Sequence, residues 1–240
     1  MKYLNLRSDE RRALSFYLAM EEYAAQSLWQ GEDLFFMWRV DPTVICGRNQ
    51  DIPHEVDLDY CRERGIDVFR RKSGGGCVYA DMSNVMLSYI TRGDDVKAAF
   101  DRYMDMLAEA LNKVGVAAER NDHNDILVGG RKVSGNALSH ADGMIIAHGT
   151  LLYDTDMENM SRAITPDNAK LSRNAVKSVS QRITFLKDFT DKPLGQIMAE
   201  IRASLCDGEA TLSDSDERTI REIERQYPNQ VQHPKQIQAP

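Results

Sequence analysis

Three consecutive glycines between two strand-like segments constrain this chain more than any other feature. Residues 74–76 are all glycine, and three cations precede them at positions 70–72. The residues at 67–70 and 77–79 favour strands on both sides. Glycine allows positive φ and exposes main-chain N–H groups to a ligand, and arginine and lysine favour an anion. The stretch therefore predicts an anion-binding loop between strands, with a solvated turn as the alternative.

Composition places the chain among folded proteins and limits its partners. The 240 residues are 42% hydrophobic, which is enough for a folded core. The formal net charge of −7 shows that the chain as a whole is not basic, as a nucleic-acid-binding protein would be. No apolar run approaches the roughly 18 residues of a membrane span, and the first residues lack a signal-peptide core. The four cysteines form neither a C-x-x-C pair nor a zinc pattern. We therefore expect free thiols, a cytoplasmic protein, and no nucleic-acid or membrane partner.

Hydrophobic periodicity predicts helices and strands in irregular alternation. The expected helices cover 8–28, 55–64, 94–114, 193–205 and 214–227, and the expected strands cover 34–40, 43–47, 67–70, 77–79, 85–90, 144–153 and a hairpin at 124–135. This order favours an α+β fold with a mixed, largely antiparallel sheet flanked by helices over a βαβ repeat. We expect one domain over residues 1–228 and a polar tail at 229–240.

The hairpin places a lysine beside a carboxylate. A two-residue Gly-Gly turn at 129–130 fixes its register, so that Leu127 faces Lys132 and Asp125 faces Ser134. Opposed residues share a face, and so do residues two apart, so all four side chains point the same way. A functional lysine on rigid strands is one interpretation. An exposed ion pair, contributing about 0–1 kcal/mol, is the other.

A third motif is the strand His-Gly-Thr-Leu-Leu at 148–152. His148 and Thr150 share one strand face, and Gly149 lets another group approach. On its own, a structural histidine is the simpler interpretation. A metal site at Asp122, His123 and Asp125 is a further alternative, although this spacing resembles no closed zinc site.

Together these motifs resemble the lipoate–protein ligase A family, within the wider biotin/lipoate ligase and octanoyltransferase superfamily. The resemblance covers about residues 8 to 190. The matching segments are 34–39, 44–50, 70–79, 124–126, 130–137, 148–152, 177–179 and 182–184. It implies the catalytic-domain fold of biotin and lipoate ligases, which is similar to class II aminoacyl-tRNA synthetases, with a tunnel for an acyl chain.

The resemblance also implies a reaction and its partners. Lipoate and ATP form lipoyl-adenylate, with Mg²⁺ bound largely through the nucleotide phosphates. The lipoyl group then passes to a lysine of an acyl-carrier domain, either a lipoyl domain of a 2-oxoacid dehydrogenase or the H-type protein of glycine cleavage. Lipoate and octanoate are both short apolar carboxylates, and the residues do not decide between them.

Residue roles follow from the same resemblance. Lys132 matches the central lysine that contacts the phosphate and the acyl carbonyl, and Asp125 matches the carboxylate that places Mg²⁺ or orients Lys132. Trp38, Val44 and Val78 are candidates for the apolar slot. The substrate-binding residues implied are Trp38, Arg71, Ser73, Gly74, Gly75, Gly76, Val78, Tyr79, Asn84, Asp125, Ser134, Ala137, His148 and Thr150.

Departures from the family leave rival functions open. Well-known bacterial members carry a smaller C-terminal domain, which we expect to be absent here. Without that domain, three alternatives are open: a separate accessory subunit, weak adenylation, or transfer from an already activated donor. A cysteine-dependent octanoyl- or lipoyltransferase needs a cysteine near the lysine, and only Cys77 is a candidate, which we interpret as packing. A lipoate-binding module without ATP chemistry is the non-catalytic alternative, and a biotin ligase is less similar.

Overall fold

Two β-sheets organise the chain in the computed structural model, which describes residues 1–8, 10–164 and 182–227. The strands are β1 (Lys2–Asn5), β2 (Leu34–Trp38), β3 (Thr43–Cys46), β4 (Asp67–Arg70), β5 (Val78–Ala80), β6 (Asn84–Arg92), β7 (Ala118–Arg120), β8 (Asp125–Val128), β9 (Arg131–Ala141), β10 (Met144–Leu152) and β11 (Gly208–Thr211). The large sheet has the order β11-β1-β2-β6-β10-β9-β8-β7, and the small sheet has the order β4-β3-β5. Most neighbours are antiparallel, whereas β1 pairs in parallel with β2 and β11, and β3 with β4. The predicted α+β fold with a mixed, largely antiparallel sheet is confirmed.

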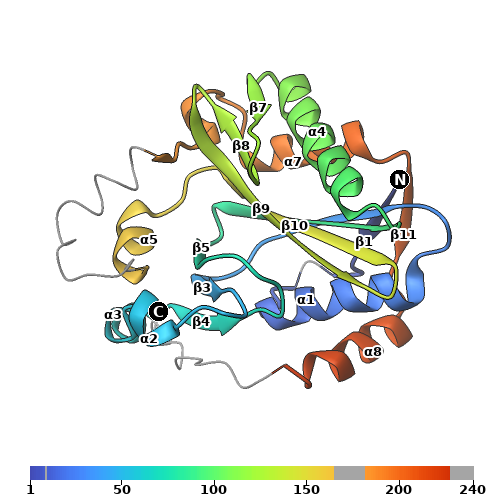
Figure 1. Cartoon of the computed structure of the whole chain (residues 1–240), viewed down its shortest axis with the longest axis horizontal. Coiled ribbons are helices and arrows are strands. Elements are labelled where there is room, and N and C mark those ends of the chain that lie inside the picture. The colour runs from blue at the N-terminus through green and yellow to red at the C-terminus, as the bar shows by residue number, and fades with distance from the viewer. Residues whose placement is uncertain (9, 165–181, 228–240) are drawn as a thin grey trace.

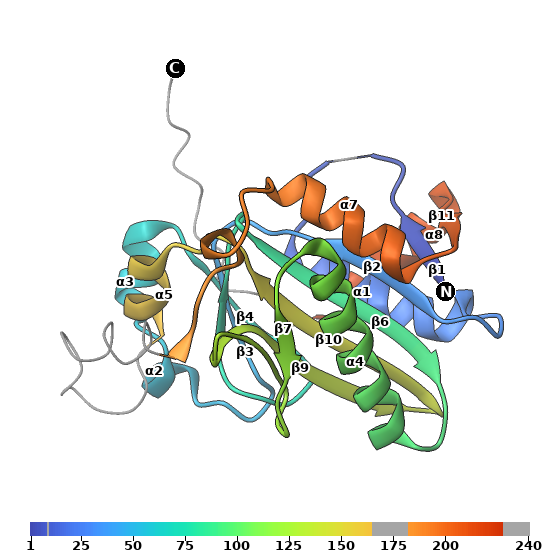
Figure 2. The same cartoon turned by 90° about the horizontal axis from the view of Figure 1, so that it is seen from above.

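Helices cover both faces of the large sheet (Figure 1, Figure 2). The helices are α1 (Leu14–Tyr23), the π-helical turn η1 (Ala24–Leu28), α2 (Ile52–Glu55), α3 (Leu58–Arg64), α4 (Val96–Val114), α5 (Met157–Ala163), the 3₁₀ turn η2 (Leu186–Asp188), α7 (Leu194–Leu205) and α8 (Asp214–Glu224). α4 and α7 pack on one face, and α1 lies on the other face with α8 against it. No helix in the described ranges combines the length and the apolar character needed to cross a membrane.

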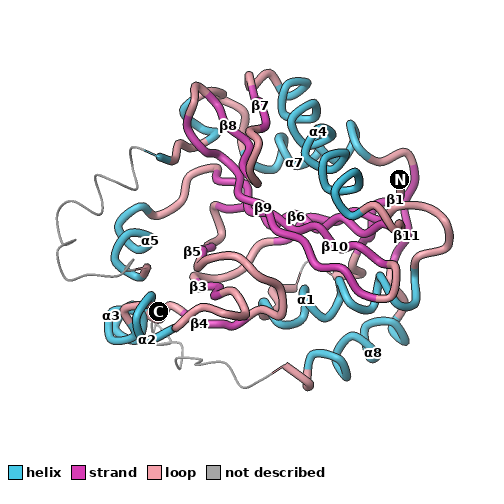
Figure 3. The backbone as a smooth tube through the Cα atoms, in the orientation of Figure 1, coloured by secondary structure: helices cyan, strands magenta, loops and turns pink. Residues whose placement is uncertain are grey.

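The strands of the large sheet are apolar on both faces because both faces are covered. Along β6, Leu87 points into the core beneath α4, and Met86 points into the core beneath α1. The same alternation holds along β2, where Phe35 and Phe36 enter opposite cores. A strand buried on both sides needs a continuous apolar run instead of an alternating one. The small sheet lies to one side, next to α2, α3 and α5 (Figure 3).

Most predicted elements are present, and α4 has the predicted ends. Asp95 caps its first turn by accepting from the N–H of Ala98 at 2.9 Å, and Gly115 ends it with φ of 97°. The first helix, however, begins at Leu14 instead of residue 8. Ala13, in an extended conformation, is the residue before its first turn, and Ser8 Oγ accepts instead from Arg12 Nη2 at 3.2 Å.

The predicted helix at 55–64 is wrong in its start, because α2 and α3 are separate. Val56 is extended and forms a bridge with Ile164, and Asp57 then caps α3 by accepting from the N–H of Tyr60 at 2.8 Å. Strands β1, β7 and β11 were not predicted. Two predictions, the polar tail at 229–240 and the motif at 177–179, fall outside the described residues.

Candidate functional site

Arg71 shapes the glycine loop from within. Its guanidinium donates to the main-chain oxygens of Gly74 at 2.6 Å, Gly76 at 2.9 Å and Ile45 at 2.9 Å, and to Ser73 Oγ at 3.1 Å. Burial lowers the pKa of Arg71, and these oxygens offset the cost of burying its charge. We expected Arg71 to offer its charge to a substrate, whereas here it mainly stabilises the loop.

Two glycines let the loop fold close to strand β3. A Cβ at Gly47 would lie 1.9 Å from the carbonyl oxygen of Gly75, so no larger residue fits there. Gly75 itself has φ of 93°, a conformation that favours glycine. The N–H of Arg48 also donates to the carbonyl of Ser73 at 2.9 Å. The loop therefore has a defined, packed conformation and is not a loose solvated turn.

Lys132 pairs with Asp125 as predicted, but the strand register differs. Lys132 Nζ lies 2.7 Å from Asp125 Oδ1, and both side chains are about one-third exposed. The hairpin contains a β-bulge, so Asp125 pairs with Gly135 instead of Ser134. The bulge turns Ser134 to the buried face, and the prediction that it binds substrate is not supported. A Cβ at Gly135 would lie 2.6 Å from Lys132 Nζ, so the absence of a side chain at this position makes room for the ammonium group.

Two adjoining cavities meet at Lys132. The smaller has a volume of about 240 Å³, and the larger has about 660 Å³. Both are lined by Val78, Asp125, Lys132, Gly135 and Thr150. A ligand in each cavity could therefore approach the same ammonium group.

Apolar side chains from both sheets and from α1 line the smaller cavity, which we call the slot. They are Leu14, Leu18, Trp38, Ile45, Val78 and Met86. Trp38 and Val78 were predicted as slot residues. Val44 was also predicted but is fully buried on the opposite side of β3, where successive side chains alternate, and Ile45 lines the slot instead. The slot fits a short apolar chain with a polar head at Lys132.

A hydrogen-bond network connects residues of the slot wall. His148 Nε2 lies 2.9 Å from Ser73 Oγ, and His148 Nδ1 lies 3.2 Å from Glu21 Oε2. Ser88 Oγ donates to Glu21 at 2.6 Å and accepts from Trp38 Nε1 at 2.9 Å. Each His148 nitrogen thus has a partner that orients the ring. This network links the slot wall to the glycine loop. The sequence analysis did not predict Glu21, because it lies within an apolar helical pattern.

The structure brings most of the predicted residues together. Those lining the slot are Trp38, Arg71, Gly75, Gly76, Val78, Asp125, Lys132, Ala137, His148 and Thr150. Tyr79 lines only the larger cavity, and Ser73 and Gly74 support the loop. Asn84 is fully buried and donates to the carbonyl of Tyr79 at 3.3 Å, so its predicted substrate contact is not supported.

Several lining residues were not predicted. They are Leu14, Leu18, Ile45, Met86, Asn124, Gly135, Asn136 and Gly149. A Cβ at Gly149 would lie 2.0 Å from Asn136 Oδ1, which explains the glycine after His148. The apolar members look like ordinary core residues in the sequence, so no local signal identifies them.

The cysteine near the loop faces away from the slot. Cys77 packs against the cluster around α3, with its thiol 3.5 Å from Glu55 Oε2. Its pKa is raised by a hydrogen bond with Cys46, by burial and by Glu55. A thiol held protonated is a poor nucleophile, which favours the packing interpretation over a cysteine-dependent transferase.

The metal-binding capacity of the site is limited. Within the described ranges, no group of three or more His, Cys, Asp or Glu residues is arranged to hold a metal ion, which leaves the alternative at Asp122, His123 and Asp125 unsupported. Asp125 offers one carboxylate at the junction of the cavities. A single carboxylate fits Mg²⁺ that takes its other ligands from phosphates and water.

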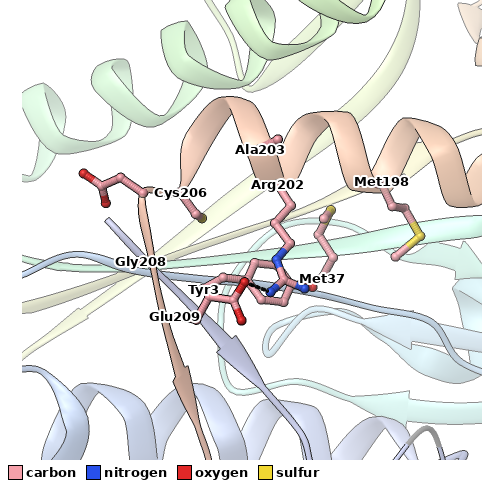
Figure 4. Close-up of a pocket in the computed structure, with 10 residues that line it drawn as sticks. Tyr3, Met37, Met198, Arg202, Ala203, Cys206, Gly208 and Glu209 are labelled. Atoms are coloured by element: carbon pink, nitrogen blue, oxygen red, sulfur yellow. Dashed lines mark hydrogen bonds and ion pairs between the residues drawn. The ribbon is translucent and has the colours of Figure 1, made fainter.

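Hollows elsewhere that are larger than the slot, but smaller than the second cavity at Lys132, contain none of the predicted site residues. One of about 540 Å³ lies between α7, β1, β2 and β11. Figure 4 shows Arg202 there between Tyr3 and Glu209. The Arg202 guanidinium stacks 4.2 Å from the centre of the Tyr3 ring. Another, of about 590 Å³, is lined mainly by charged residues around α8.

Similarity to known proteins agrees with this geometry. Residues 14–206 match the family model of the lipoyl protein ligase A/B catalytic domain. The chain is 37% identical over 175 residues to the lipoate-protein ligase LplJ of Bacillus subtilis, covering 72% of this chain and 53% of that protein. It is also 37% identical over 178 residues to lipoate–protein ligase 1 of Staphylococcus aureus, covering 74% and 54%. The chain thus spans about half the length of the curated relatives it matches.

Solved structures show the same fold. One belongs to a bi-partite lipoate protein ligase of Thermoplasma acidophilum, with a TM-score of 0.83, 25% identity, and coverage of 94% of this chain and 92% of that one. Another is a lipoate-protein ligase A bound with ATP, with a TM-score of 0.77, 25% identity and 94% coverage of both chains. A further structure, of a ligase from T. acidophilum with bound lipoic acid, has a TM-score of 0.78.

Proposed function

Because the chain belongs to the lipoyl protein ligase A/B catalytic domain family, we propose that it is a lipoate–protein ligase. It would activate lipoate with ATP to lipoyl-adenylate and transfer the lipoyl group to a lysine of a lipoyl domain. One observation carries this proposal. The Lys132 ammonium stands where an apolar slot of about 240 Å³ opens into a larger cavity of about 660 Å³.

The first step suits the two cavities. The slot takes the apolar tail of lipoate and directs its carboxylate toward Lys132, while the larger cavity takes ATP. The carboxylate oxygen attacks the α-phosphorus, and pyrophosphate leaves. Negative charge develops on the phosphate oxygens, where Lys132 and the N–H groups of residues 76–79 oppose it. Bound Mg²⁺, held at Asp125, would neutralise phosphate charge.

The second step uses the same lysine. The acceptor amine attacks the acyl carbonyl, a C–N bond forms, the C–O bond to phosphate breaks, and AMP leaves while the amine loses a proton to solvent. Lys132 stabilises the oxyanion as it develops. Asp125, at 2.7 Å, and Gly135 keep the ammonium at the cavity junction throughout.

A similar protein supports the proposed acceptor proteins. The T. acidophilum ligase was solved in a study that includes its E2 lipoyl domain, which favours lipoyl domains as acceptors. We extend the proposal to the H-type protein of glycine cleavage, because it presents the same kind of acceptor lysine. We also propose that residues 1–228 act as one catalytic unit, that a separate accessory subunit assists it, and that the protein works in the cytoplasm, a compartment that fits its four free cysteines.

One experiment separates the candidate functions. The pure chain is mixed with ATP, Mg²⁺, lipoate or octanoate, and an unmodified lipoyl domain, and pyrophosphate and acceptor mass are measured. A ligase releases pyrophosphate and labels the acceptor. A transferase labels it only from an acylated carrier protein, and a binding module does neither while still binding lipoate. Pyrophosphate release with labelling only after an accessory subunit is added supports the two-subunit form.

A further inference from the structure

Two thiols face each other beneath the glycine loop. Cys46 is the last residue of β3, and Cys77 comes just before β5. These strands are antiparallel, and Ile45 pairs with Val78, so the next position sets Cys46 opposite Cys77. Ile45 and Val78 line the slot, and side chains alternate along a strand. Both cysteines therefore share the opposite face, where they pack in one cluster.

The pair is attached to both ends of the loop. The carbonyl of Cys46 accepts from the N–H of Arg71 at 2.9 Å, and Gly47, the next residue, abuts Gly75. Cys77 directly follows Gly76, which lines the slot. A covalent bond between the two sulfurs would therefore change the path of the main chain that lines the slot and the larger cavity.

The surroundings favour a thiolate at Cys46 and a partly exposed thiol at Cys77. The pKa of Cys46 is lowered by the hydrogen bond from Cys77 and by Arg70 and Arg71, against the effect of burial. The pKa of Cys77 is raised by the same hydrogen bond, so the negative charge belongs on Cys46 and the proton on Cys77. Cys46 is fully buried, whereas Cys77 lines the larger cavity and is open to small molecules.

We propose that Cys46 and Cys77 form a reversible disulfide that switches the loop between two states. The oxidant is a low-molecular-weight disulfide of the glutathione type. Its S–S bond is attacked by the Cys77 sulfur while the Cys77 proton passes to the neighbouring Cys46 thiolate, which gives a mixed disulfide and releases one small thiolate. Cys46 then gives this proton to the small thiolate and attacks the Cys77 sulfur, which expels the second small thiol as its thiolate. In total, two protein thiols are oxidised and one small disulfide is reduced to two thiols.

Geometry permits this bond without a large movement. Directly opposed residues of antiparallel strands have Cβ atoms about 4.5–5.5 Å apart, and a disulfide needs about 3.5–4.5 Å. Cys77 lies outside the hydrogen-bonded part of β5, so its main chain can shift. That shift displaces the N–H groups of residues 76–79. We expect the oxidised protein to lose adenylation, an effect that rests on the proposed function.

Peptide mapping tests the bond independently of any activity. The full chain is incubated with oxidised glutathione, free thiols are blocked, and the digest is analysed without reductant. We expect a peptide joining Cys46 to Cys77 that disappears on reduction, and the same peptide in Cys61→Ala. Cys61 is the matched control because it is buried in the same cluster with its pKa raised to about 12 by burial. A Cys46–Cys61 link, or glutathione left on Cys77 alone, overturns the proposal.

Pyrophosphate release then tests the switch. Oxidation should abolish release in the unsubstituted chain, and a reductant should restore it, whereas the release rate of Cys77→Ala, whatever its reduced value, should be the same with and without oxidant. A linked peptide with unchanged release refutes the switch. If the reduced chain releases no pyrophosphate at all, the proposed function fails, while the mapped bond still stands as a result.

Discussion

At the scale of single residues, the site depends on how one ammonium group is held. Lys132 is fixed by Asp125 on the neighbouring strand and by the space that Gly135 leaves beside it. The pair is about one-third exposed, so its contribution to folding stability is small. Its importance lies in position, because a preorganised cation stabilises charge that develops during the reaction.

Replacing Lys132 with Met should therefore remove chemistry and keep the fold. Methionine retains much of the apolar stem, and losing one preorganised charge-stabilising group slows a reaction by about 10²–10³-fold. We expect such a fall in pyrophosphate release with an unchanged melting temperature. Arg131→Met is the control, since Arg131 is exposed at the neighbouring position. Equal rates in Lys132→Met and the unsubstituted chain would remove Lys132 from the mechanism.

At the scale of elements, the glycine loop and the hairpin each rely on close approach. The loop's carbonyls turn inward to Arg71, and this leaves its outer main chain free to face a ligand. The hairpin's bulge moves one side chain, Ser134, to the buried face and brings Asp125 level with Gly135. The loop needs glycine at positions 47 and 75, and the hairpin needs it at 135, because larger residues would collide or be strained there.

The glycines of the loop should differ sharply in their tolerance of alanine. In Gly47→Ala the new Cβ would lie 1.9 Å from a main-chain oxygen, so the loop must move, and we expect lower stability and loss of pyrophosphate release. In Gly74→Ala the new Cβ meets nothing within 4 Å, so we expect near-normal behaviour. Melting curves and release assays on the two variants compare them directly. A tolerated Gly47→Ala would show that the loop is not packed as described.

Helix α8 depends on its first turn. Ser213 Oγ accepts from the N–H of Asp216, and the Asp216 carboxylate accepts in return from the N–H of Ser213. Removing such a cap costs about 0.5–2 kcal/mol, so Ser213→Ala should lower the free energy of unfolding by that amount. Denaturant titration measures it. Ser215→Ala, inside the first turn of the same helix, is the control and should change the free energy of unfolding little.

The same cap predicts a pH effect. Burial raises the pKa of Asp216, but hydrogen bonds from Tyr23 and Ser213 outweigh it, and the net pKa is lowered. A carboxyl group with a lowered pKa stabilises the fold above its unfolded pKa of about 3.9 and loses that contribution as the pH falls through the folded value. The stability difference between the unsubstituted chain and Asp216→Asn should therefore be present at pH 7 and shrink in acid. A difference that is constant with pH would contradict this.

At the scale of the whole molecule, the slot lies where the two sheets and α1 meet. Ile45 and Val78 come from the small sheet, Trp38 and Met86 from the large one, and Leu18 from the helix. A ligand in the slot thus contacts parts of the chain that are otherwise joined by loops. Binding should stabilise the entire fold and not one element.

Lipoate should therefore raise the melting temperature of the chain without ATP. At 100 times the dissociation constant, a ligand adds about 2.7 kcal/mol, which corresponds to about 5–10 °C for a domain of this size. Acetate is the matched control, because it has the carboxylate but no apolar tail, and it should have no effect. An equal rise with acetate would mean that the slot is not the binding site.

Sequence reasoning was accurate where the signal is local. The caps of α4 at Asp95 and Gly115, the strands beside the glycine loop, and the pairing of Leu127 with Lys132 all follow from neighbouring residues. Edge strands such as β1 and β11 were missed because they are short and pair across most of the chain length. No periodicity within four residues signals such a partner.

The amino-acid sequence by itself determined the glycine loop between strands, the lysine–carboxylate pair and the family resemblance, because each depends on residue type and short spacing. Only the tertiary structure decided that Arg71 turns inward, that Ser134 is buried, and that Leu14 and Leu18 complete the slot. The physical reason is that side-chain direction is set by register, and a single bulged residue reverses it. A slot wall, likewise, exists only once distant segments pack together.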